Sequence, residues 1–70
     1  MRLELIKARR KKEWTQKQLA ERVNVSEQMI GHLETGRRDG SAKLRDKIAK
    51  ALRVSQRSLW HQQETTRQGD

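Results

Sequence analysis

Three helix starts of the same form recur in this chain, and they constrain its fold more than any other feature. In each, an apolar residue precedes Ser or Thr, and a second apolar residue follows four positions after the hydroxyl. The three sets are Trp14-Thr15-Leu19, Val25-Ser26-Ile30 and Val54-Ser55-Leu59. The hydroxyl can cap the first helical turn while the two apolar side chains pack together. The pattern therefore predicts helices that begin at or just after residues 15, 26 and 55.

The rest of the chain also favours helices. Proline is absent, and no run of residues alternates as a strand would. We expect helices over residues 2–12, 15–23, 27–34 and 41–52, and a short fifth helix after Ser55. Asn24 tolerates the left-handed conformation of a tight turn, and Gly36 can end the third helix with a positive φ. The expected fold is all-α, a compact five-helix domain.

The length of 70 residues allows one domain, which we place at residues 1–60. The last ten residues, HQQETTRQGD, offer no apolar anchor, so we expect a polar, disordered tail at residues 61–70. Apolar stretches are too short to cross a membrane. The absence of cysteine excludes disulfides and thiolate zinc sites, and it favours a cytoplasmic setting.

The charge is strongly unbalanced. Seventeen Lys and Arg stand against nine Asp and Glu, a formal net charge of +8. Such a chain favours polyanionic partners, and charge alone leaves DNA, ribosomal RNA and an anionic membrane surface open, as well as a charge that only keeps a small protein soluble. The order of the residues has to decide between them.

The second and third expected helices are separated by about three residues, a spacing typical of a helix-turn-helix. The stretch TQKQLAERVNVSEQMIGHLETG, residues 15–36, resembles that motif in the Cro and phage-repressor family, in which Gln opens the second helix and Glu-x-Gly ends the third. A weaker likeness continues through KIAKALRVS. Asn24 and Arg53 stand where the family more often has Gly. The resemblance implies a repressor-like domain, encoded by a bacterium or phage, with the third helix in the major groove of double-stranded DNA.

The third expected helix carries the candidates for reading bases, because Ile30 and Leu33 turn its other side inward. Gln28 can pair bidentately with adenine, and Glu27 can accept a hydrogen bond from cytosine or simply favour the helix start. His32 can reach a base edge or a phosphate. The other two candidates are Gly31 and Met29.

Gly31 lowers helix propensity, which indicates a close approach by another helix or by DNA. Met29 can contact a thymine methyl group or fill the crevice between the two helices.

Phosphate contacts are expected around this helix. By the resemblance, Gln16 lies where family members clamp a phosphate at the start of the second helix. Four cations are further candidates, since phosphate binding needs charge more than an exact geometry. They are Lys17, Arg37, Arg38 and Lys43.

The resemblance also implies a structural ion pair between Arg9 and Glu34. One helix reads few base pairs, so we expect a homodimer that binds two half-sites about 34 Å apart in an inverted repeat. Leu59 and Trp60 are candidates for a dimer contact, with closure of the monomer core as the alternative for Trp60.

The leading hypothesis is a sequence-specific transcriptional regulator that acts as a repressor. One alternative is an antitoxin-type interaction module that binds a partner protein and its own operator, and another is charge-driven binding to any nucleic acid. Serines lie at expected helix caps, and the two histidines lack a companion carboxylate cluster. We therefore expect no enzymatic activity, no metal and no cofactor.

Overall fold

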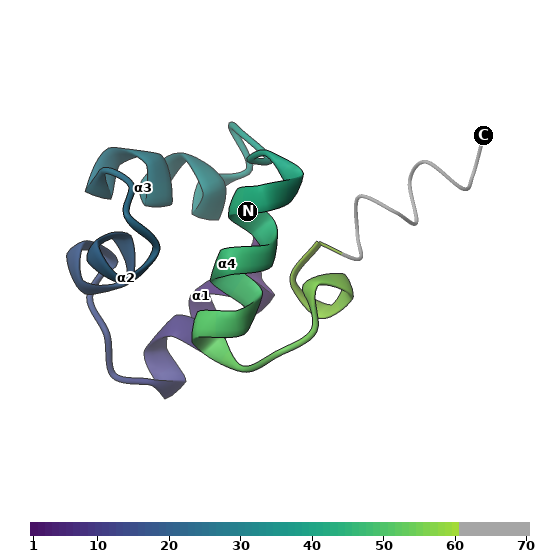
Figure 1. The fold of residues 1–70 in the computed structure, drawn as a ribbon, viewed down its shortest axis with the longest axis horizontal. Helices are drawn as coiled ribbons and strands as arrows, with labels where there is room; N and C mark the ends of the chain where they lie inside the picture. The colour runs from purple at the N-terminus through teal and green to yellow at the C-terminus, as the bar shows by residue number, and fades with distance from the viewer. Residues whose placement is uncertain (61–70) are drawn as a thin grey trace.

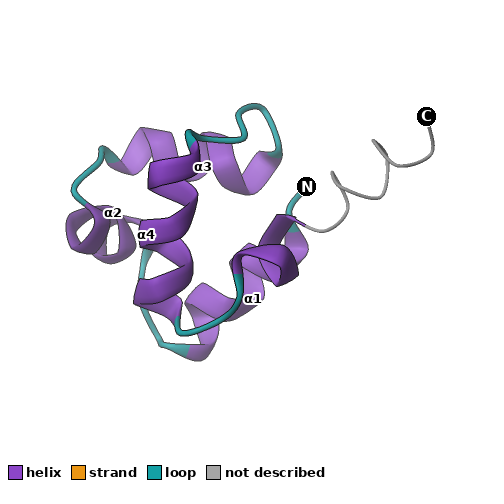
Figure 2. Ribbon diagram, turned by 45° about the vertical axis from the view of Figure 1, so that its right-hand side comes forward, coloured by secondary structure: helices purple, strands orange, loops and turns teal. Residues whose placement is uncertain are grey.

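The computed structural model describes residues 1–60, which form an all-helical domain (Figures 1 and 2). The helices are α1 (Leu3–Lys11), α2 (Gln16–Val23), α3 (Glu27–Thr35) and α4 (Ala42–Leu52), and residues 56–60 are helical again. No strand occurs within this described part. The predicted all-α, five-helix architecture is confirmed. The tail expected at residues 61–70 lies outside the described residues.

Hydroxyl caps begin the helices that follow α1, whereas the residue before α1, Arg2, makes no capping hydrogen bond with its side chain. Thr15 and Gln18 form a capping box, in which the Thr15 hydroxyl accepts from the Gln18 N–H at 3.0 Å and the Gln18 side chain accepts from the Thr15 N–H at 2.8 Å. Three serines each accept a hydrogen bond of 3.1 Å from the N–H three residues on; they are Ser26, Ser41 and Ser55. Because a cap residue is not itself helical, α2 begins at Gln16 and α4 at Ala42, one residue after the predicted starts.

The turns between helices rely on left-handed residues. Gly36 has a φ of 87° at the end of α3, where it was expected, although the helix runs one residue further than predicted, to Thr35. Asn24 and Arg53 end α2 and α4 with φ values of 63° and 60°. Glu13 also has a positive φ, 61°, which nothing in its sequence context indicated.

One face of each helix meets the others in a single core. In Figure 1, α4 crosses the middle of the molecule, with α2 to one side and α3 above. The buried apolar residues are Leu5, Leu19, Ala20, Val23, Ile30, Leu33, Ile48, Ala49, Leu52, Leu59 and Trp60. No helix in the described part is long and apolar enough to cross a membrane.

Arg2 ties the start of the chain to the loop that follows α3. Its guanidinium donates to the carbonyl of Leu33, to the carbonyl of Arg38 at 3.1 Å and to the carboxylate of Asp39 at 2.9 Å. The same group lies 5.4 Å from the centre of the Trp60 ring. The Arg2 side chain is only 11% exposed. It therefore holds together three segments that are distant in sequence.

We expect Arg2→Ala to lower the free energy of unfolding by about 2 kcal/mol, because it removes charge-assisted hydrogen bonds from a largely buried group. Thermal and urea unfolding followed by circular dichroism measure this. Lys7→Ala is the matched control, since Lys7 is 71% exposed and meets Glu4 only at 3.8 Å. The control is expected to change stability by less than about 0.5 kcal/mol. Equal effects of the two substitutions would contradict the role given to Arg2.

Candidate nucleic-acid interface

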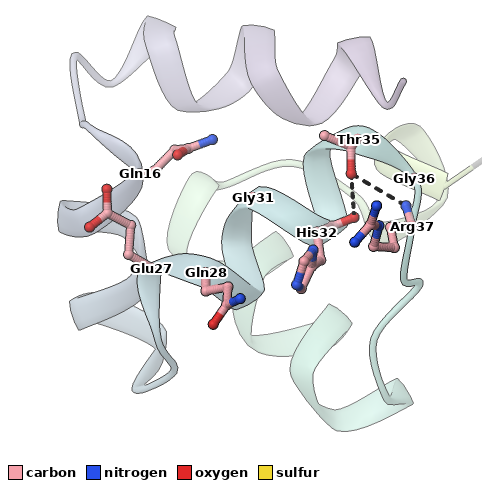
Figure 3. A pocket seen from close by; sticks show the side chains of 8 residues that line it. All are labelled: Gln16, Glu27, Gln28, Gly31, His32, Thr35, Gly36 and Arg37. Atoms are coloured by element: carbon pink, nitrogen blue, oxygen red, sulfur yellow. Dashed lines mark hydrogen bonds between the residues drawn. The ribbon is translucent and has the colours of Figure 1, made fainter.

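The outward side of α3 borders an open hollow of about 890 Å³ (Figure 3). Its lining comes from the start of α2, from α3 and from the residues that follow α3. The lining residues are Gln16, Glu27, Gln28, Gly31, His32, Thr35, Gly36 and Arg37. The buried side of the same helix holds Ile30 and Leu33 in the core. One helix thus presents an apolar face to the protein and a polar face to solvent.

Four of the five base-reading candidates come together in this hollow. Gln28 and His32, one turn apart, point to the same side of α3, whereas Glu27 points toward the start of α2 (Figure 3). The fourth, Gly31, lies between them on the helix. Met29 does not line the hollow. It is half-buried and packs against the core, which fits the crevice interpretation of this residue.

Gly31 has no neighbour that requires a glycine. A Cβ built on it would meet no atom of the described residues within 4 Å, apart from the backbone of its own helix and its chain neighbours. Its φ is not positive, in contrast to those of Gly36 and Gly40. Close approach by another helix of residues 1–60 therefore does not explain this glycine.

A polar network fixes one edge of the hollow. The Arg9 guanidinium donates to both carboxylate oxygens of Glu34, at 2.6 Å and 3.3 Å, so the predicted ion pair is present. Its side chains are 11% and 5% exposed. Arg9 also donates to the carbonyl of Trp14 at 2.8 Å. The side-chain amide of Gln16 donates to Glu34 at 2.8 Å, a bond that the sequence did not indicate. The start of α2 is thereby fastened to the end of α3.

The four candidate cations are all exposed. Arg37 lines the hollow, and the other three lie outside its lining. Lys17 lies in the first turn of α2 and Lys43 in the first turn of α4. Arg38 lies in the loop after α3, where its N–H donates to the carbonyl of His32 at 3.2 Å.

Leu59 and Trp60 do not form an exposed surface. They are 3% and 4% exposed and belong to the core of the monomer. The short helix that begins after Ser55 turns both side chains inward, so the alternative weighed for Trp60, closure of the core, describes its position. A dimer contact through these two residues would require them to leave the core. Within residues 1–60, no three metal-ligating side chains lie together.

Comparison with known proteins points to one family. Residues 5–57 match the model of the helix-turn-helix family. The match includes α2 and α3, all eight residues of the hollow and the Arg9–Glu34 pair. Neither the curated proteins nor the solved structures gave a significant match.

Proposed function

Since this chain belongs to the Cro/C1-type helix-turn-helix family of DNA-binding regulators, we propose that it is a sequence-specific transcriptional repressor. In this proposal α3 enters the major groove of double-stranded DNA, and the bound protein blocks access to a promoter. The observation that carries the proposal is the uncovered polar face of α3, where Gln28, Gly31 and His32 share one hollow. A major groove about 12 Å wide admits an α-helix with its side chains.

Base reading is assigned to the exposed polar side chains of α3. Gln28 offers an amide that can donate to adenine N7 and accept from its N6 amine, and His32, on the same side, can meet the next base or a phosphate. Glu27 has a different role. The Glu27 side chain points toward the start of α2, which favours a role in orienting the part of the interface where α2 and α3 meet. Its carboxylate could also accept a hydrogen bond from cytosine N4.

Phosphate contacts would flank the helix. The first turn of α2 presents backbone N–H groups and the Gln16 amide, which Glu34 holds in position. A net charge of +8 supplies long-range attraction to the duplex. The cations assigned to the backbone are Lys17, Arg37, Arg38 and Lys43.

Specificity would require two copies. A single α3 reads only a few base pairs, so we propose a homodimer on DNA with half-sites about one helical turn apart in an inverted repeat. Acting on bacterial or phage DNA, the protein would work in the cytoplasm. The proposed function needs no catalytic step and no cofactor.

The test is selection of sites from a random duplex library at physiological salt, repeated with Gln28→Ala. The intact protein is expected to enrich an inverted repeat. Gln28→Ala is expected to lose about 5- to 150-fold of discrimination at one position of each half-site, equivalent to about 1–3 kcal/mol. Gln56→Ala is the matched control, because Gln56 lies outside the hollow. Enrichment of no motif, with affinity that simply fades as salt rises, would contradict sequence-specific binding.

A further inference from the structure

Gly31 is a position where the fold itself would be better served by alanine. Glycine inside a helix costs about 1 kcal/mol relative to alanine. Gly31 lies in the middle of α3, its φ is not positive, and its missing Cβ would meet nothing within 4 Å. No steric reason within residues 1–60 therefore favours glycine here. A partner that binds this face would supply such a reason.

The surroundings of Gly31 define the shape of that binding site. Residues four apart lie in one row on a helix, so Gly31 separates Glu27 from Thr35. Gln28 and His32 form the neighbouring row, and all of these residues line the hollow. The absent side chain thus leaves a notch about the size of one methyl group, with an apolar Cα at its base and polar side chains around it.

We propose that this notch receives the C5-methyl group of a pyrimidine in the major groove. The inference rests on the proposed function, because it presupposes that α3 lies in that groove. The C5-methyl is the apolar group that a base edge presents there, beside hydrogen-bonding atoms that the surrounding polar side chains can meet. Thymine carries it in ordinary DNA, and 5-methylcytosine carries it in methylated DNA. A Cβ at residue 31 would occupy the place of that methyl group.

The experiment is a double-mutant cycle, in which the affinities of the intact protein and of Gly31→Ala are measured for DNA with and without one base change. Each thymine of the selected site is replaced in turn by deoxyuridine, which removes only the methyl group. The intact protein is expected to lose about 4-fold in affinity at one position of each half-site, as burial of one methyl group implies. Gly31→Ala is expected to bind the thymine site about tenfold more weakly, because the new methyl group overpacks the contact. Because uracil leaves room for the new Cβ, Gly31→Ala should bind the deoxyuridine site more tightly than the thymine site at that position, the reverse of the preference of the intact protein.

The melting temperature of Gly31→Ala provides the control for folding. Because alanine is the better helix former and has open space here, we expect the melting temperature to rise by about 4–8 °C while affinity falls. A fall in melting temperature would show that the fold needs the glycine, and would overturn the inference. Deoxyuridine at thymines away from this position is the matched DNA control, and its effect should be the same for both proteins.

The two sources of the methyl group are separated by a second set of duplexes, in which each cytosine is replaced by 5-methylcytosine. Thymine is the source if a deoxyuridine substitution weakens binding, and 5-methylcytosine is the source if methylation strengthens it. Either effect must be lost or reversed in Gly31→Ala. If the intact protein binds a defined site but Gly31→Ala shows the same response to every methyl group, the inference fails and the proposed function stands. If no site is enriched, both fail.

Discussion

Glu34→Ala is expected to lower the free energy of unfolding by about 3–5 kcal/mol, because it breaks a buried ion pair by removing one partner. The substitution leaves the Arg9 guanidinium, 11% exposed, without the carboxylate that compensates its charge. It also removes the acceptor of the Gln16 amide. A domain of this size has only about 5 kcal/mol of stability, so about 0–2 kcal/mol would remain and between about 3% and about half of the variant would be unfolded at 25 °C. Urea unfolding followed by circular dichroism measures the shift of the midpoint.

Two control variants distinguish the loss of this buried ion pair from the loss of an exposed one. Asp46→Ala removes an exposed carboxylate that meets Lys50 at 3.1 Å, and it is expected to cost less than about 0.5 kcal/mol. The double variant Arg9→Leu/Glu34→Leu removes both buried charges, so it should recover much of the stability that Glu34→Ala loses. If Glu34→Ala costs no more than Asp46→Ala, the buried pair contributes no more to stability than an exposed one.

Trp60→Ala is expected to cost about 3–5 kcal/mol, as removal of a buried indole from a packed core typically does. Trp60 is 4% exposed, and the Arg2 guanidinium lies over its ring. Trp60→Phe is the matched control. It keeps an aromatic ring in place and removes an indole N–H that is buried without an acceptor in the described part of the chain. We expect it to cost less than about 1.5 kcal/mol.

The same variant tests the predicted dimer contact. If Trp60 serves the core of the monomer, the loss of stability in Trp60→Ala should be the same at protein concentrations that differ 100-fold. If Trp60 served a dimer interface, the stability of the intact protein would rise with concentration and that dependence would vanish in the variant. A loss of stability in Trp60→Ala that changes with protein concentration would contradict the core role of this residue.

Local features of this structure could be predicted from sequence because their causes are local. A hydroxyl cap, its backbone partner and the flanking apolar pair lie within six residues, so Thr15, Ser26 and Ser55 marked helix starts correctly. The left-handed conformation at Asn24 and Gly36 follows from residue type. The pairing of Arg9 with Glu34 required the family resemblance, because no periodicity joins residues 25 positions apart.

What the sequence could not indicate depends on how the helices pack. Arg2 reaches carbonyl and carboxylate groups 31 to 37 residues away, a contact that only the assembled fold creates. Met29 lies at the border between the buried and the exposed side of its helix, where the crossing with a neighbour decides its burial. For Trp60, the sequence allowed either a dimer contact or closure of the monomer core. Its side chain lies in the core because of how the last helix packs against the others.

The network of Arg9, Glu34 and Gln16 also bears on how a genetic screen of this protein should be interpreted. Substitutions at Arg9 or Glu34 would weaken regulation as a change at Gln28 would, although neither residue needs to touch an operator. They would do so by reducing the amount of folded protein, which cellular proteases deplete. Loss-of-function alleles would therefore fall into two classes, those that reduce the amount of folded protein and those that impair recognition of DNA. The phenotype alone does not distinguish them. Protein abundance separates them, because only the alleles that spare it report on recognition.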